Sequence, residues 1–329
     1  MTNRVQFVNL NDVKSEYLPI NCGVPQGSIL GPLLFLLYIN AISNISSIID
    51  IILFADDTNI FFSDKCLTTL ESRVNTEIQK ISRWLKINKL SLNIKKTNYI
   101  IFESKQKIIN YKLNIKLDNI EIEQVSFTKF LGVIINENLT WENHIKVVKN
   151  KISKSMGILA KIKSNVPCVI LRNLYFMLLQ PYLEYCNIVW ATGKSVMLNK
   201  LLVIQNKVLR IITNSPWNTH APPIFSKLNI LTVFGINKLQ TACFMYKVMN
   251  NLVPSFFVNM FTVNSAIHNY NTRQKNNLHV PSYRIKVREH SVSVCGVKMW
   301  NDIPEELKEL RTYNQFKLKC KRYLLLKQL

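Results

Sequence analysis

The sequence predicts an α+β protein in which an antiparallel sheet with helices is followed by a largely helical region. Residues 1–135 contain short β-rich runs that alternate apolar and polar side chains around turn residues, next to one long amphipathic pattern. Residues 136–260 carry apolar side chains at three- and four-residue spacing, which is typical of helices. Residues 261–329 read as a looser basic segment that ends in a helix. We therefore expect three segments along the chain.

The first segment is expected to open with a hairpin or edge strand over residues 4–20. It leads into the loop from Gly23 to Ser28, where the Ser28 hydroxyl can cap the helix that follows. Pro32 suits the first turn of that helix, because the N–H that proline lacks would have no partner there. Apolar residues on nearly every side of residues 33–38 predict that this helix is buried.

The next predicted element is a hairpin with two acidic residues at its tip. Apolar β-rich runs at residues 48–54 and 59–62 flank the short turn Ala55-Asp56-Asp57-Thr58. Asp56 and Asp57 therefore fall where the two strands meet.

The remaining elements follow from the same two periodicities. Alternation predicts a second hairpin over residues 113–122, around an Asp118-Asn119 turn, and a strand over residues 130–135. Apolar steps of three and four residues predict helices over residues 67–85 and, after Thr140 as the expected N-cap, over residues 141–162, 168–180, 196–213 and 233–251.

Charge is distributed unevenly between the segments. Residues 1–135 carry 15 Lys and Arg and 12 Asp and Glu, a net charge of +3, whereas residues 136–329 carry 27 and 8, a net charge of +19. A positive field of this size attracts a polyanion, so we expect a nucleic acid partner whose binding weakens with salt. The alternative is a basic surface that is merely solvated.

Composition excludes a membrane-spanning protein and a zinc knuckle. No apolar stretch reaches the roughly 20 residues that a membrane-spanning helix needs, so we expect no membrane partner. The seven cysteines form no Cys-x-x-Cys pair and no Cys/His cluster at zinc spacing. We interpret them as reduced thiols of an intracellular protein, in the nucleus or the cytoplasm.

Asp56 and Asp57 are candidates for metal binding. Transfer of a nucleotide requires divalent cations bridged by carboxylates, and magnesium prefers hard oxygen ligands. Two adjacent aspartates more often decorate a solvated turn, but apolar strands on both sides favour the metal site. The glycine-rich loop about 30 residues upstream can let its backbone approach a ligand closely, and it can equally be an ordinary entry into a helix.

Together, GVPQGSILGPLLF at residues 23–35 and FADD at residues 54–57 closely resemble the reverse transcriptases of jockey-like non-LTR retrotransposons. The resemblance extends along the chain. LNIKKT at residues 92–97 is similar to the family's following motif and FLGV at residues 130–133 to its primer grip. PYLEY at residues 181–185 and WNDIP at residues 300–304 resemble the region after the polymerase core.

The resemblance implies a partial right-hand polymerase. Residues 1–135 would form part of the palm, residues 136–260 a basic helical thumb and connection, and residues 261–329 a basic C-terminal segment. The activity of the intact parent would be RNA-directed DNA synthesis by two-metal nucleotidyl transfer. Its partners would be an RNA template, a DNA primer and deoxynucleoside triphosphates.

The resemblance also assigns roles to single residues. Asp56 and Asp57 would be catalytic and would hold Mg²⁺ or Mn²⁺. Lys96 would donate a proton to pyrophosphate, although a lysine at this place is more often a surface charge. Leu131 and Gly132 would form the primer grip. Five residues would contact the template or the nucleotide: Pro25, Gln26, Gly27, Ser28 and Phe54.

One departure from the family is expected to abolish activity. The family's palm carries another metal-binding aspartate, on a strand before the Gly23 loop and followed closely by Ala-Phe. Here Asp12 lies in a polar stretch and Asp50 belongs to the hairpin itself, so neither fits. We therefore expect a truncated polymerase that is inactive by itself. The alternative is a non-enzymatic nucleic-acid-binding protein derived from a retrotransposon.

Overall fold

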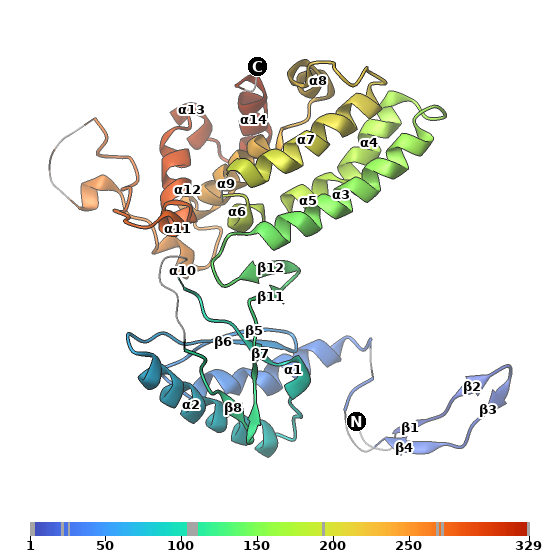
Figure 1. Cartoon of the computed structure of the whole chain (residues 1–329), viewed down its shortest axis with the longest axis vertical. Coiled ribbons are helices and arrows are strands. Elements are labelled where there is room, and N and C mark those ends of the chain that lie inside the picture. The colour runs from blue at the N-terminus through green and yellow to red at the C-terminus, as the bar shows by residue number, and fades with distance from the viewer. Residues whose placement is uncertain are drawn as a thin grey trace. The chain divides into compact units, whose positions relative to one another are not determined.

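The computed structural model describes residues 4–20, 23–25, 27–103, 111–192, 195–267, 270 and 273–327. The chain divides into two compact units. The N-terminal unit comprises Met1–Tyr99 and Ile109–Val125, and the helical unit comprises Ile100–Ile108 and Ser126–Leu329. Strands and helices alternate in the first unit, whereas the second is almost wholly helical (Figure 1).

The N-terminal unit contains short strands and two long helices. Its strands are β1 (Arg4–Gln6), β2 (Asn9–Leu10), β3 (Val13–Lys14), β4 (Leu18–Ile20), β5 (Asp50–Phe54), β6 (Asp57–Phe61), β7 (Asn98–Tyr99), β8 (Lys116–Leu117), β9 (Ile120–Glu121) and β10 (Glu123–Gln124). Its helices are α1 (Leu30–Ile39), η1 (Asn40–Asn44), α2 (Leu67–Ile87) and η2 (Ile94–Lys96).

The strands of this unit pair two by two. Among the described residues, β1 pairs with β4, β2 with β3, β5 with β6 and β8 with β9, all antiparallel, while β7 and β10 are parallel. The mixed composition of strands and helices confirms the predicted α+β class. The single antiparallel sheet that we expected is not formed, because no ladder in the described part of the chain joins one pair to the next.

The predicted hairpins are present. Residues 4–20 form the β1–β4 ladder with the β2–β3 ladder at its end. In the β8–β9 hairpin, Asp118 and Asn119 form the turn with φ values of +47° and +66°. Ser82 and Lys86 of α2 both contact the Asp118 carboxylate, at 2.8 Å each, and this fastens the hairpin to the helix.

The burial predicted for helix α1 is wrong. The buried residues of the core beside it are Ile39, Ile42, Ile49, Ile81 and Leu85. Helix α1 contributes to them only its last residue, while Phe35 packs against this core partly buried. The apolar side chains of the helix are exposed by up to 69%: Leu30, Leu33, Leu34, Leu36, Leu37 and Tyr38. The sequence shows that the helix is apolar, but burial also requires neighbouring elements. The described residues provide such neighbours on only one side of α1.

The helical unit begins with a hairpin and continues with packed helices. The hairpin is β11 (Phe127–Phe130) and β12 (Val133–Asn136). The helices are α3 (Glu142–Ile162), α4 (Cys168–Leu178), α5 (Gln180–Glu184), α6 (Asn187–Trp190), α7 (Ser195–Ile212), α8 (Ala221–Leu228), α9 (Val233–Met249), α10 (Ser255–Val258), η3 (Asn264–Ala266), α11 (Lys286–Glu289), α12 (Val292–Asn301), α13 (Glu305–Lys308) and α14 (Tyr313–Leu326). The helices predicted over residues 141–162, 168–180, 196–213 and 233–251 are therefore confirmed.

One continuous core runs through the helical unit. Leu159 of α3, Leu201 of α7 and Met245 of α9 are completely buried. Helices α12 and α14 pack on α9, and Phe316 of α14 stacks on Tyr246 of α9 with ring centroids 4.4 Å apart. The C-terminal residues thus belong to the same core as α3 and α7. No helix in the described part of the chain is long and apolar enough to cross a membrane.

Two local predictions in this unit are wrong. The strand expected over residues 130–135 is interrupted by a hairpin turn, in which Leu131 and Gly132 have φ values of +44° and +84°. The N-cap of α3 is Trp141 rather than Thr140. The side-chain oxygen of Asn136 accepts hydrogen bonds from the backbone N–H groups of Thr140 and Trp141, and this moves the start of the helix by one residue.

Candidate active site

The two aspartates lie at the tip of the β5–β6 hairpin, as the sequence predicts. Phe54 pairs with Asp57, so the loop consists of Ala55 and Asp56 alone. Ala55 has a φ of +50°, a conformation that favours glycine in tight hairpin turns. Its small side chain limits the steric cost, and the turn places Asp56 and Asp57 side by side, both exposed.

The two faces of this hairpin differ in their surroundings. Ile51, Leu53 and Ile60 face the small core of the N-terminal unit, and this anchors the hairpin on one side. The opposite face carries Asp57 and its cross-strand partner Phe54, which is 58% exposed. The aspartates are therefore held by a packed hairpin but project from its open face.

The pair supplies oxygen ligands that suit Mg²⁺ but only part of a metal site. Asp50 pairs with Phe61 at the other end of the hairpin, four residues or about 13 Å along the strand from Phe54. Asp12 lies in the turn of the β2–β3 ladder. Within the described ranges, no three His, Cys, Asp or Glu residues come together as a metal site would require. The described residues therefore bring no third ligand to the two aspartates.

The glycine-rich loop precedes helix α1. The N-cap of α1 is Ile29 rather than the predicted Ser28, but Ser28 Oγ accepts a hydrogen bond from the N–H of Gly31 at 3.0 Å, next to the start of the helix. Gly27 has a φ of +83°, which glycine adopts without strain. Gln26 lies outside the described residues. No hydrogen bond or ion pair between described residues joins Pro25, Gly27 or Ser28 to the aspartates.

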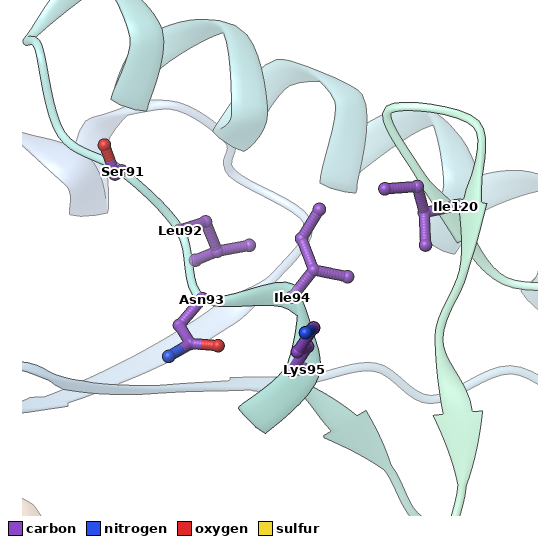
Figure 2. A pocket seen from close by; sticks show the side chains of 6 residues that line it. All are labelled: Ser91, Leu92, Asn93, Ile94, Lys95 and Ile120. Atoms are coloured by element: carbon purple, nitrogen blue, oxygen red, sulfur yellow. The ribbon is translucent and has the colours of Figure 1, made fainter.

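Lys96 ends the short helix η2, and its side chain is exposed. Next to it, a shallow hollow is lined by Ser91, Leu92, Asn93, Ile94, Lys95 and Ile120 (Figure 2). Leu92, Ile94 and Ile120 give the hollow an apolar wall, to which hairpin β8–β9 contributes. The described residues provide Lys96 with no ion pair, so its predicted role as a proton donor rests on the family resemblance.

Leu131 and Gly132, the expected primer grip, form the turn of the β11–β12 hairpin and are held by Tyr185. The Tyr185 hydroxyl donates a hydrogen bond to the carbonyl oxygen of Leu131 at 2.6 Å, and a Cβ added at Gly132 would lie 3.4 Å from the Tyr185 ring. An electrostatic interaction with the adjacent Cys186 sulfur, followed by desolvation, raises the pKa of Tyr185, so its hydroxyl stays protonated and continues to donate. The position of this turn is therefore set by the PYLEY motif.

A second contact holds the body of the same hairpin. The N–H of Ile134 donates to Nδ1 of His144 at 3.3 Å, and the His144 ring lies 5.3 Å from that of Trp190. Trp190 is fully buried and donates its Nε1–H to the carbonyl of Tyr185 at 2.8 Å. Burial, and then the charge of Lys151, lowers the pKa of His144, so the imidazole is neutral and can accept this bond. Hairpin and helices α3 and α6 thus form one connected structure.

Sequence reasoning missed both of these contacts. Tyr185 lies 54 residues from Leu131, and no local pattern indicates that they meet. His144 carries no motif of its own. The glycine at position 132 was the available signal for a turn, since a glycine within an apolar run often marks a position with positive φ.

The helical unit also carries most of the positive charge. Lys146, Lys149, Lys154 and Lys161 are exposed on α3, on faces other than the one that Ile152 and Leu159 bury. Lys200 and Lys207 are exposed on α7. Such lysines can contact a phosphate backbone without reading sequence.

Comparison with known proteins finds similarity to the polymerases of mobile elements. Residues 3–135 match the sequence profile described as reverse transcriptase (RNA-dependent DNA polymerase). The chain is similar to the probable RNA-directed DNA polymerase from transposon X-element of Drosophila melanogaster, with 25% identity over 67% of this chain and 25% of that protein. It is also similar to the RNA-directed DNA polymerase from mobile element jockey of the same organism, with 25% identity over 78% of this chain and 28% of that protein.

A third relative is a Pol polyprotein. The Pol polyprotein from type-1 retrotransposable element R1 2 of Nasonia vitripennis is 26% identical over 51% of this chain and 43% of its own length. The chain thus spans about a quarter of the length of the two Drosophila relatives. No solved structure gives a significant match.

Proposed function

We propose that this chain is part of the RNA-directed DNA polymerase of a jockey-like retrotransposon and that it binds primer–template without extending it. The match of residues 3–135 to the reverse transcriptase profile supports the family, and two further assignments are made. The proposal assigns nucleic acid binding to the helical unit, and it assigns an incomplete catalytic centre to the N-terminal unit.

The proposed inactivity rests on one observation, that Asp56 and Asp57 have no third metal-binding side chain beside them in the described ranges. Reverse transcriptases use divalent metal ions, which activate the primer hydroxyl and neutralise pyrophosphate when they are bound. In this proposal Asp56 and Asp57 would be two of the ligands, and no third acid accompanies them in the described ranges. A missing ligand that costs about 4 kcal/mol in the transition state would lower the rate about a thousandfold.

The proposed arrangement follows that of a right-hand polymerase. Residues 1–135 supply part of the palm, with Pro25, Gln26, Gly27, Ser28 and Phe54 as contacts to template and nucleotide and Lys96 as a proton donor to pyrophosphate. Residues 136–260 form the thumb and connection, and residues 261–329 the C-terminal segment. Leu131 and Gly132 would meet the primer end, and the contact from Tyr185 supports this because it holds their turn in one place.

Binding and extension can be measured on the same preparation. We expect the purified chain to bind an RNA template annealed to a DNA primer and to lose affinity steeply as chloride rises, since lysine–phosphate contacts release counterions. We expect no extension with Mg²⁺ or Mn²⁺ and deoxynucleoside triphosphates. Extension that Asp56→Asn abolishes would overturn the proposed inactivity, and affinity independent of salt would overturn the proposed electrostatic binding.

A second candidate is a non-enzymatic nucleic-acid-binding protein derived from a retrotransposon. It is favoured by the helical unit, which has its own core and most of the positive charge. Translation of the genomic DNA before the codon for Met1 distinguishes the two. An in-frame segment with an aspartate closely followed by Ala-Phe favours the polymerase, whereas a promoter directly before this start favours the binding protein.

A further inference from the structure

The loop between α7 and α8 presents a tryptophan to solvent on a well-fixed turn. Trp217 is 87% exposed, more than any other aromatic residue in the described part of the chain. Single exposed apolar residues are common on proteins and need no explanation by themselves. Three features of this loop distinguish it: its rigid construction, the position of Trp217 within it, and the cations that hold it.

The first half of the loop is a regular helix ending. After Ile212, the last residue of α7, Asn214 adopts a φ of +49°. The N–H of Ser215 donates to the carbonyl of Arg210 at 2.9 Å, and the N–H of Asn214 donates to that of Ile211 at 3.2 Å. These two bonds around a left-handed residue form a Schellman motif, which satisfies the last carbonyls of the helix and fixes the direction in which the chain leaves it.

The second half is a β-turn with the tryptophan at its tip. The N–H of Thr219 donates to the carbonyl of Pro216 at 3.1 Å, so Trp217 and Asn218 occupy the two central positions. Turn positions of this kind usually carry small polar residues. The indole is exposed there and packs on no core, and the turn presents one of its faces to solvent without the need for the loop to rearrange.

Two cations fasten the loop to the neighbouring helices. Nε of Arg210 donates to the carbonyl of Thr219 at 2.9 Å, and Nζ of Lys163 donates to the side-chain oxygen of Asn214 at 3.4 Å. The two cations therefore bind loop residues that lie two and three positions from Trp217 in the sequence, Thr219 and Asn214. No Asp or Glu occurs anywhere in residues 185–288, so the local charge is uncompensated by sequence neighbours.

We propose that the loop Asn214–His220 is a binding site for single-stranded nucleic acid, in which an unpaired base stacks on Trp217 while Arg210 and Lys163 neutralise the adjacent phosphates. The inference rests on the proposed binding of nucleic acid by the helical unit. It adds the loop at which a single strand binds and the stacking by which it is held. An aromatic platform next to cations is the combination that single strands require, because every base has a π-face and every nucleotide a charge. A purely apolar protein partner would use the indole but not the cations.

Substitutions can separate stacking from charge. The probe is a fluorescein-labelled oligouridylate of about 12 nucleotides, a length within the range that single-strand sites cover. We expect Trp217→Ala to weaken binding about 5- to 100-fold and Trp217→Phe to retain most of the affinity. The salt dependence of Trp217→Ala should equal that of the wild type, because no charge is lost. Lys163→Gln should reduce the slope of the salt dependence by about one.

The matched control is Phe256→Ala, which removes an aromatic side chain that is 71% exposed elsewhere in the helical unit. It should leave the affinity unchanged, and all variants should melt at the wild-type temperature. Equal binding by wild type and Trp217→Ala would overturn the inference while leaving nucleic acid binding intact. If Trp217→Ala instead abolished self-association in sedimentation, the tryptophan would be a protein contact and the inference would be wrong. No binding of the oligouridylate by the wild type would also overturn the inference, whereas binding of annealed primer–template by the same protein tests the proposed function separately.

Discussion

The two units of this chain differ in how completely each buries its own apolar side chains. In the helical unit, a continuous core runs from α3 to α14, and Leu201 and Phe316 are completely buried. In the N-terminal unit, the core beside α1 has five buried residues, and most of α1 faces solvent. Hydrophobic burial dominates folding stability, so the helical unit should be stable by itself and the N-terminal unit only marginally. The candidate active site lies in the N-terminal unit, which we expect to be the less stable of the two.

Two leucine truncations, one in each unit, should differ most in how they change the free energy of unfolding. Leu201→Ala, in the helical core, should lower the free energy of unfolding by about 2–5 kcal/mol because it leaves a cavity. Leu33→Ala, on α1 and 54% exposed, should change it by about 0.5 kcal/mol or less. Chemical denaturation followed by circular dichroism measures both. Similar losses for the two variants would show that α1 is buried in solution and would remove the difference between the units.

Gly132→Ala tests the turn of the β11–β12 hairpin, with which the helical unit begins. The φ of +84° at this position is unfavourable for a residue with a Cβ, so we expect a loss of about 1–2 kcal/mol. The added Cβ itself meets the Tyr185 ring at 3.4 Å, an ordinary contact distance, so backbone strain is the cause. Gly157→Ala on α3, where nothing lies within 4 Å of the added atom, is the control and should not destabilise. If Gly132→Ala left the free energy of unfolding unchanged, this would contradict the positive φ of Gly132 in the turn.

Hairpins and helices could be predicted from sequence here, whereas their partners could not. The β5–β6 hairpin follows from two β-rich runs around an acidic turn, and α2 from a regular apolar spacing. The exposure of α1 could not be predicted, because periodicity describes one element and burial requires two. The turn at Leu131 and Gly132 was hidden inside an apolar run. Its contact with Tyr185 depends on the tertiary fold over 54 residues.

A pH titration should act on the helical unit through His144. Burial lowers the pKa of this residue below its usual 6.5, and the neutral ring accepts the N–H of Ile134. The unfolded chain therefore binds the proton more readily, so this contribution is complete above about pH 6.5 and is lost as pH falls through the lower pKa of the folded state. The stability of His144→Asn, measured between those limits, should depend less on pH. Parallel profiles for the two proteins would exclude the histidine as the cause.

The smallest effect concerns a thiol in the N-terminal unit. A hydrogen bond from the Thr68 hydroxyl, followed by backbone N–H groups at the start of α2, lowers the pKa of Cys66 to about 7. At neutral pH, iodoacetamide should modify Cys66 faster than the exposed Cys168, and mass spectrometry of the peptides resolves the two sites. Thr68→Val should slow the reaction of Cys66 alone. Equal rates at both cysteines would show that the start of α2 is not formed as described.

In the proposed function, Asp56 and Asp57 belong to a polymerase centre that lacks a third acid among the described residues. The most direct measurement is primer extension by two proteins side by side: this chain, and the same chain preceded by the corresponding upstream segment of the jockey polymerase. We predict extension by the second protein only, abolished there by Asp56→Asn, although both bind primer–template. Extension by the chain alone, or extension by the longer protein that survives Asp56→Asn, would contradict the claim.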